Sequence, residues 1–243
     1  MAGLMRVLTK GATVGSKMTT DLYDEGYWER GEGSNYSRYG NDPHWPATID
    51  TLKAALPANV VAGSWLEVAC AKGYFVLEAR ARGLNVVGVD LSEYAISKAL
   101  PEVQPHVRVG TVLDLPYGDG EFDVLVAWEF MEHIPEEDLG RAVREMLRVT
   151  RPGAYLIYRI GISDPSPAVS GATYEQHDHS HFHEVPSSWW RDDFASRGWD
   201  HLSDVEVALN TAHAGVDWVG RFFAYRTPLY PSRQTLDAGW SVH

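Results

Sequence analysis

Cysteine, basic residues and long apolar runs are scarce in this chain of 243 residues. Cys70 is the only cysteine, so no internal disulfide can form, and we expect a reducing compartment, the cytoplasm. No stretch approaches about 20 apolar residues, so the sequence predicts no membrane partner. Lysine and arginine number 21 against 33 acidic residues, a net charge of −12, which disfavours a nucleic-acid partner. These absences leave a small molecule as the expected partner.

The hydrophobic content of 44% is enough for one large core, so one α/β domain with a lid is the natural organisation. We expect a flexible leader over residues 1–20, an N-terminal lid over 21–46, the ligand-binding domain over 47–227 and a tail over 228–243. The oligomeric state is left open by the sequence.

The segment Leu66-Glu-Val-Ala-Cys-Ala-Lys-Gly73 has the pattern of a strand that runs into a sharp turn and opens a helix. A second apolar strand, Asn85-Val-Val-Gly-Val-Asp90, follows and ends in an acid. A strand, a small-residue turn, a helix and an acid-tipped strand form the layout of a nucleoside-binding βαβ unit, in which the acid accepts hydrogen bonds from ribose hydroxyls. The two segments therefore predict a nucleoside site.

The chemistry of the turn narrows the ligand. A dinucleotide pyrophosphate favours glycine where the backbone approaches it, whereas Ala69 and Ala71 carry side chains and only Gly73 does not. A phosphate-free nucleoside such as S-adenosylmethionine fits better, and its cationic groups suit neighbouring acids. Alanine tolerates such a turn where φ is negative, and we expect negative φ at both alanines.

Four segments together resemble the class I S-adenosylmethionine-dependent methyltransferases: 66–73, Val86-Val-Gly-Val-Asp90, Asp114-Leu-Pro116 and Phe122-Asp-Val-Leu-Val-Ala-Trp-Glu129. The resemblance implies a Rossmann-like α/β fold, with a seven-stranded sheet, helices on both faces, an antiparallel last strand and an N-terminal aromatic lid. It implies S-adenosylmethionine as the cofactor and methyl transfer as the activity.

The same resemblance assigns roles to individual residues. Asp90 would hold the ribose hydroxyls, Leu91 would contact adenine, and Asp114 with Leu115 would meet its amino edge. The aromatic residues of the lid would close over the methionine carboxylate, although ordinary hydrophobic packing is the alternative for each, as a turn role is for Asp114. The predicted cofactor-binding residues are Tyr27, Tyr36, Tyr39, Glu67, Ala69, Ala71, Gly73, Asp90, Leu91, Asp114, Leu115 and Trp128.

Four histidines alternate in His177-Asp-His-Ser-His-Phe-His183, which would place them on one face of an extended segment. Metal binding, a substrate or base role, and a solvated polar loop are all compatible with this pattern. We favour the second and expect no metal, because catalytic metal ligands normally come from separate rigid segments. The predicted catalytic residues are His181, His133 and Glu129, and the predicted substrate-binding residues are Arg159, His177, Asp178 and Trp189. For His133 a packing role at a helix entry is the alternative.

Hydrophobic periodicity predicts the remaining elements. Helices are expected over 47–56, 74–82, 92–100, 136–149 and 187–197. Strands are expected over 64–69, 85–90, 107–111, 122–128, 154–161, 205–209 and 218–226. Residues 163–185 lack periodicity, which is typical of a functional or disordered loop.

The sequence therefore predicts an enzyme that transfers a methyl group to an oxygen or nitrogen of a small metabolite. A cyclase that consumes S-adenosylmethionine and releases methylthioadenosine with a cyclic amino acid is the alternative. A non-catalytic S-adenosylmethionine-binding protein would not need an aromatic lid and a His-rich loop, and an NAD-dependent oxidoreductase would need glycine at Ala69 and Ala71.

Overall fold

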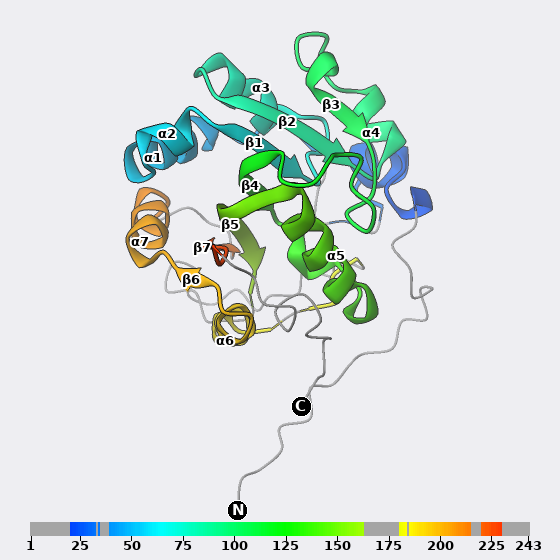
Figure 1. Cartoon of the computed structure of the whole chain (residues 1–243). Helices are drawn as coiled ribbons and strands as arrows, with labels where there is room; N and C mark the ends of the chain where they lie inside the picture. The colour runs from blue at the N-terminus through cyan, green and yellow to red at the C-terminus, as the bar shows by residue number, and fades with distance from the viewer. Residues whose placement is uncertain are drawn as a thin grey trace, which may run out of the picture.

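The computed structural model describes residues 20–32, 34, 39–162, 180–183, 185–214 and 220–229. Within them lies a seven-stranded sheet in the order β3-β2-β1-β4-β5-β7-β6 (Figure 1). β7 is antiparallel to both of its neighbours, and the other pairs are parallel. The Rossmann-like sheet predicted from the sequence is therefore confirmed. The predicted leader and tail lie almost entirely outside the described residues.

The strands are β1 (Ser64–Val68), β2 (Asn85–Asp90), β3 (Val107–Val109), β4 (Phe122–Trp128), β5 (Thr150–Gly161), β6 (Asp200–His201) and β7 (Gly220–Arg226). The helices are α1 (Trp45–Ala55), α2 (Ala58–Val61), α3 (Tyr74–Ala81), α4 (Glu93–Ser97), α5 (Glu136–Val149), α6 (Ser187–Ser196) and α7 (Ser203–Ala212). Four short turns of helix are η1 (Thr20–Leu22), η2 (Gly26–Arg30), η3 (Gln104–His106) and η4 (Met131–His133).

Two hydrophobic layers cover the two faces of the sheet. On one face α5 and α6 bury residues such as Leu139, Met146 and Trp190. On the other, α1, α3 and α7 pack through residues that include Leu52 and Leu209. Both faces of β4 are covered, which explains why that strand is almost continuously apolar. β2, β4 and α5 have the predicted bounds.

The predicted strand over residues 205–209 is wrong, because this segment lies in helix α7. Val205 and Leu209 are buried, whereas Val207, which a strand would place on the same face, is 63% exposed, so the burial pattern is helical. Asp204 and Glu206 lie in the first turn, where acids interact favourably with the helix dipole. The sixth strand is instead the two-residue β6, and β5 begins at Thr150, earlier than the predicted 154.

Parallel β1, β2 and β4 bring their carboxyl ends to the same edge of the sheet. Ligands of open α/β sheets bind beyond this edge, and the turn after β1, Asp90 and Glu129 all lie there.

Among the described helices, none is long and apolar enough to cross a membrane.

Candidate cofactor and substrate site

The turn after β1 has left-handed backbone at three positions: φ is 58° at Ala69, 49° at Ala71 and 74° at Gly73. The expectation of negative φ at the two alanines is therefore wrong. A Cβ in the left-handed region costs about 1 to 2 kcal/mol, and such strain is characteristic of functional turns. Hydrogen bonds hold the turn in place, with Cys70 N–H donating to Val89 O at 3.0 Å and Gly73 N–H to Cys70 O at 2.8 Å.

Asp90 closes this turn from the end of β2. One carboxylate oxygen accepts the Ala71 N–H at 2.7 Å, and the other accepts the Ser92 N–H at 2.8 Å. Burial raises the pKa of Asp90 to about 6, and the two backbone hydrogen bonds oppose that shift. A carboxylate oxygen has more than one acceptor site, so Asp90 can still accept hydrogen bonds from a ribose diol.

Glu67 lies beneath the turn and is buried. Its Oε2 has no hydrogen-bond partner among the described residues. Burial, followed by the charge of Asp90, raises the pKa of Glu67 well above its usual range. A buried acceptor without a partner is unfavourable, so this carboxyl group fits a ligand amine or a water molecule beside the turn.

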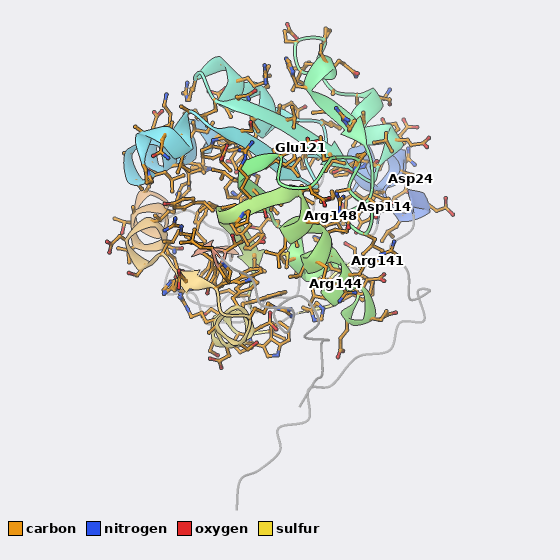
Figure 2. All side chains as sticks on the ribbon, in the orientation of Figure 1. Asp24, Asp114, Glu121, Arg141, Arg144 and Arg148 are labelled. Atoms are coloured by element: carbon orange, nitrogen blue, oxygen red, sulfur yellow. The ribbon has the colours of Figure 1, made fainter. Side chains whose placement is uncertain are left out.

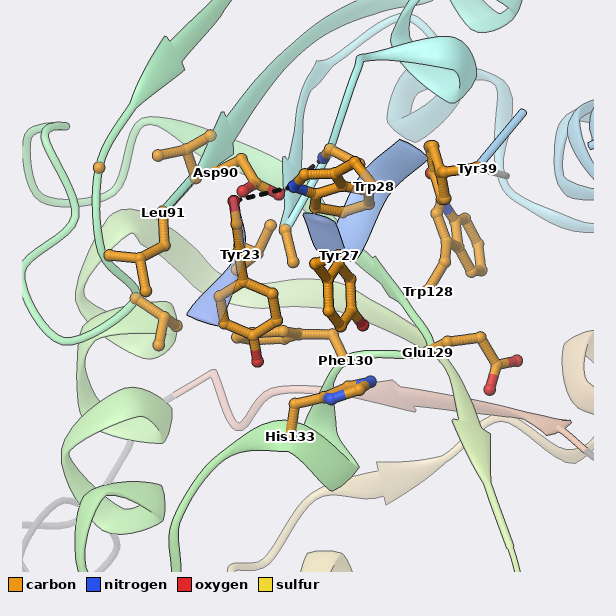
Figure 3. A pocket seen from close by; sticks show the side chains of 16 residues that line it. Tyr23, Tyr27, Trp28, Tyr39, Asp90, Leu91, Trp128, Glu129, Phe130 and His133 are labelled. Carbon is orange, nitrogen blue, oxygen red and sulfur yellow. Dashed lines mark hydrogen bonds between the residues drawn. The ribbon is translucent and has the colours of Figure 1, made fainter. Parts of the chain in front are cut away.

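A pocket opens above these groups. Figure 3 shows Asp90 and Leu91 at one end and His133 at the other, with aromatic rings between them. The lining residues are Tyr23, Tyr27, Trp28, Tyr39, Val68, Ala69, Ala71, Val89, Asp90, Leu91, Gly110, Val112, Trp128, Glu129, Phe130 and His133. Aromatic faces and acids together suit a cationic sulfonium ligand.

The N-terminal aromatic segment, which includes η2, is held against the turn after β1 and the end of β2. Trp28 Nε1–H donates to Tyr23 O and to Ser92 Oγ, each at 3.0 Å. Lys72, in the turn after β1, forms an ion pair with Glu29 of η2 at 2.6 Å, and its side chain is only 7% exposed. The segment therefore covers the pocket through contacts with the same turn that would bind the ligand.

An ion-pair network holds Glu129, which lines the pocket. Arg159 Nε donates to Glu129 Oε1 at 2.6 Å, and Arg159 Nη1 lies 3.2 Å from Asp42 Oδ2. Glu129 has φ 49°, and its N–H donates to Arg159 O at 2.7 Å. The Arg159 guanidinium also lies over the Trp45 ring, 5.1 Å from its centre. This network fixes the direction of the Glu129 side chain at the pocket wall.

A second polar group surrounds His133 of η4. His133 Nδ1 lies 2.7 Å from Ser180 Oγ, and the rings of His133 and His181 meet edge to face at 4.6 Å between centres. Glu132 is buried, and burial, followed by the charge of Glu129, raises its pKa well above the usual range. Imidazoles and carboxyl groups at this end of the pocket can exchange protons with a substrate.

Nine of the predicted site residues line the pocket: Tyr27, Tyr39, Ala69, Ala71, Asp90, Leu91, Trp128, Glu129 and His133. Glu67 and Gly73 lie buried at the turn beneath the pocket. Arg159 does not line the pocket but forms an ion pair with Glu129, which does. Tyr36, His177 and Asp178 lie outside the described residues.

Asp114, Leu115 and Trp189 do not line the pocket. Asp114 is exposed on the loop that α5 holds, where Leu115 N–H donates to Glu145 Oε2 at 2.9 Å and Leu115 is itself buried (Figure 2). Gly110 and Val112 of the same loop line the pocket instead. Trp189 stacks on His183.

Sequence reasoning missed Asp42, Glu132 and Ser180. Asp42 lies next to Pro43 in the predicted lid, and only its ion pair with Arg159 shows its place beside the pocket. Glu132 adjoins the predicted His133, so its position beside a catalytic candidate was the available signal. Ser180 interrupts the run of histidines and gave no signal of its own.

The fold and the pocket define an α/β domain that binds a nucleoside cofactor at the carboxyl edge of its sheet. Residues 66–158 match the family described as methyltransferase domain. This segment therefore carries a methyltransferase domain, which confirms the resemblance and supports S-adenosylmethionine as the cofactor. The residues present fit that cofactor, because Asp90 keeps acceptor capacity for a diol and Glu67 Oε2 is buried without a partner among the described residues.

Two curated relatives and one solved structure illustrate the similarity. The chain is 33% identical over 140 residues to a ubiquinone biosynthesis O-methyltransferase of Hahella chejuensis, covering 53% of this chain and 56% of that protein. It is 30% identical over 165 residues to norajmaline N-methyltransferase of Rauvolfia serpentina, covering 57% and 56%. Phosphoethanolamine N-methyltransferase 2 of Haemonchus contortus with S-adenosyl-L-methionine superposes with a TM-score of 0.59 at 16% identity, covering 86% of this chain and 60% of that one. The chain spans about half the length of these curated relatives.

Proposed function

We propose that this protein transfers the methyl group of S-adenosylmethionine to an oxygen or nitrogen of a small metabolite. The observation that carries the proposal is the pocket itself, which joins Asp90 at the ribose end to Glu129 and His133 at the other end in one cavity. Curated relatives include both an O-methyltransferase and an N-methyltransferase. Cys70, the only cysteine, is buried with a raised thiol pKa, which fits a structural role and the cytoplasm as the compartment.

The residues of the chain divide the work between orientation and proton removal. S-adenosylmethionine supplies a methyl group already activated on a sulfonium, so the protein mainly aligns the acceptor with it. Asp90 accepts hydrogen bonds from the ribose hydroxyls and fixes the cofactor along the edge of the sheet. The rings of Tyr27, Trp28 and Tyr39 cover the pocket and exclude water.

His133 and Glu129 are the candidate bases for the acceptor proton, because both line the pocket. The His133 ring reaches from η4 toward the cavity, whereas Glu129 is held by Arg159 (Figure 3). An acceptor between Asp90 and these groups would place its nucleophilic atom within reach of a base. His181, which touches the His133 ring, is the third candidate.

Mass spectrometry of the products tests the proposal. The protein is incubated with S-adenosylmethionine and fractionated metabolite pools, and Asp90→Ala serves as the matched control. S-adenosylhomocysteine together with a product heavier by one methylene supports methyl transfer. Methylthioadenosine with a cyclic amino acid, formed without any metabolite, would establish the cyclase instead. Cofactor binding with neither product would indicate a non-catalytic binding protein.

A further inference from the structure

Glu132, His133 and His181 converge at the substrate end of the pocket. One ligand atom from each of the three lies within 4.8 Å of the others. Glu132 and His133 come from η4, whereas His181 comes from the segment before α6. The three residues are therefore brought together by folding, from two separate parts of the chain.

Glu132 has the features of a ligand that lacks its partner. Its side chain is 0% exposed, and Oε1 accepts the Gly161 N–H at 2.8 Å, which fixes the orientation of the carboxyl group. Oε2 is buried and accepts no hydrogen bond from an N–H or O–H group of the described residues, and the carboxyl group of Glu129 is the polar neighbour of this side chain. An acceptor in this state loses its hydration without a replacement, and a cation at Oε2 would supply one.

The backbone of Glu132 also holds the segment that carries His181. The N–H groups of Phe182 and His183 donate to Glu132 O at 2.8 and 3.2 Å. His181 is thus placed by hydrogen bonds from the residues that follow it. The sequence disfavours a metal because its four alternating histidines lie on one segment. In the structure, two of the three groups lie on η4, and only His181 comes from that segment.

His133 is oriented in the manner of a metal ligand. Ser180 Oγ lies 2.7 Å from His133 Nδ1, and ligating histidines commonly have such a partner at the second ring nitrogen. The carboxyl group of Glu129 lies close by, since a Cβ built on Gly161 would lie 2.9 Å from Glu132 Oε1 and 3.6 Å from Glu129 Oε2. A cation bound at Glu132 would reduce the unfavourable interaction between these two carboxyl groups.

We propose that Glu132 Oε2, His133 Nε2 and His181 bind one divalent transition-metal ion, of the kind represented by Zn²⁺ or Fe²⁺. Two imidazoles and one carboxylate form a donor set that such ions accept, with a coordination position left for an exogenous oxygen. Because His133 also lines the cofactor pocket, that open position faces the space where the acceptor would lie. The ion would therefore orient a hydroxyl group of the acceptor. This metal site is an addition to the function proposed above.

Isothermal titration calorimetry tests the site. The metal-free, full-length chain is titrated with ZnCl₂ in the absence of S-adenosylmethionine. We expect one tight equivalent, and the same stoichiometry with CoCl₂. Glu132→Gln and His181→Ala should each weaken binding by about 100-fold or more, since loss of an orienting partner alone costs 10- to 100-fold. His201→Ala is the matched control, because His201 is a partly exposed histidine paired with Glu206 and should leave binding unchanged.

Absence of saturable binding by the unaltered chain would overturn the proposal. Binding that persists at full affinity in both Glu132→Gln and His181→Ala would place the ion elsewhere and overturn it equally. Circular dichroism checks that each variant is folded. If Glu132→Gln does not fold, His181→Ala decides by itself, because His181 is only partly buried and its replacement should be tolerated. The assay contains no cofactor, so failure of the methyltransferase proposal would not change its outcome.

Discussion

The two ends of the pocket are built in different ways. At the end near Asp90, this carboxylate accepts N–H groups from Ala71 and from Ser92, and both partners come from one βαβ unit. At the end near Glu129 and His133, Arg159 contacts Asp42 and Glu129, which lie 117 and 30 residues away in the chain. The first end rests on backbone groups that any sequence provides, and the second on side chains.

This difference has a consequence for evolution of function. A turn held by backbone hydrogen bonds keeps its shape when neighbouring side chains change, which suits a cofactor common to many enzymes. An end built from side chains can accept a new substrate through a few substitutions. The variants below test whether the two ends are separable, from the largest expected effect to the smallest.

His181→Ala should lower kcat by roughly 100- to 10,000-fold while cofactor affinity is unchanged, because a base or acceptor-orienting group acts on the chemical step. Steady-state kinetics and calorimetry measure the two quantities separately. His201→Ala, at the edge strand β6, should change neither. A drop in kcat below about tenfold would leave His181 with a packing role beside the His133 ring, and would leave His133 and Glu129 as the candidate bases.

Asp90→Ala should weaken S-adenosylmethionine binding by about 1.5 to 3 kcal/mol, roughly 10- to 150-fold, because it removes charge-assisted hydrogen bonds to the ribose. Calorimetry measures the change, with NAD as a ligand expected not to bind. Heat from NAD and none from S-adenosylmethionine would contradict the assignment of the cofactor.

Glu29→Gln should lower the free energy of opening of η2 by roughly 1 to 3 kcal/mol, because it leaves the buried Lys72 ammonium without its counter-charge. Hydrogen exchange of the η2 amides measures this opening. Glu32→Gln is the matched control, since the Arg30–Glu32 pair is exposed and solvent screens it, so its loss should leave the opening of η2 unchanged. If η2 is equally protected with and without S-adenosylmethionine, the segment is not a lid.

Cofactor affinity should depend on pH through Asp90. Its pKa is about 6 in the ligand-free protein, and the ribose hydroxyls bind the carboxylate form, so binding should tighten as pH rises through 6 and level off near 7. Below pH 6 the affinity should fall by up to about tenfold per pH unit. Calorimetry from pH 5 to 7.5 measures the slope, and the Asp90→Asn variant should lack this component. An equal slope in that variant would assign the proton to another group.

Ala69→Gly and Ala71→Gly should each stabilise the ligand-free protein by roughly 0.5 to 1 kcal/mol. Relief of a left-handed Cβ exceeds the conformational entropy that glycine adds to the unfolded chain. Urea unfolding measures the change. Ala54→Gly, at an exposed helical position of α1, should instead destabilise by up to about 1 kcal/mol. Destabilisation at all three positions would show that the turn is not strained.

Much of the fold could be predicted because its signals are local. A helix is expected to begin at Ser92, and Ser92 Oγ caps α4 by accepting the Ala95 N–H at 3.0 Å. The helical spacing in α5 and the apolar run of β4 gave their observed bounds. The strand expected over 205–209 failed because its short pattern of apolar residues is compatible with both periods. Its packing on α1 and β7 decided for the helix.

The sequence by itself determined the unit that runs from β1 through its turn and α3 to Asp90 at the end of β2. Short-range backbone geometry and hydrogen bonds dictate such a unit, so its residues can be recognised in order along the chain. Only the tertiary structure decided the partners of Arg159 and the meeting of Glu132 with His181. These contacts join segments whose separation in sequence carries no information about distance, since packing of the whole sheet and its helices brings them together.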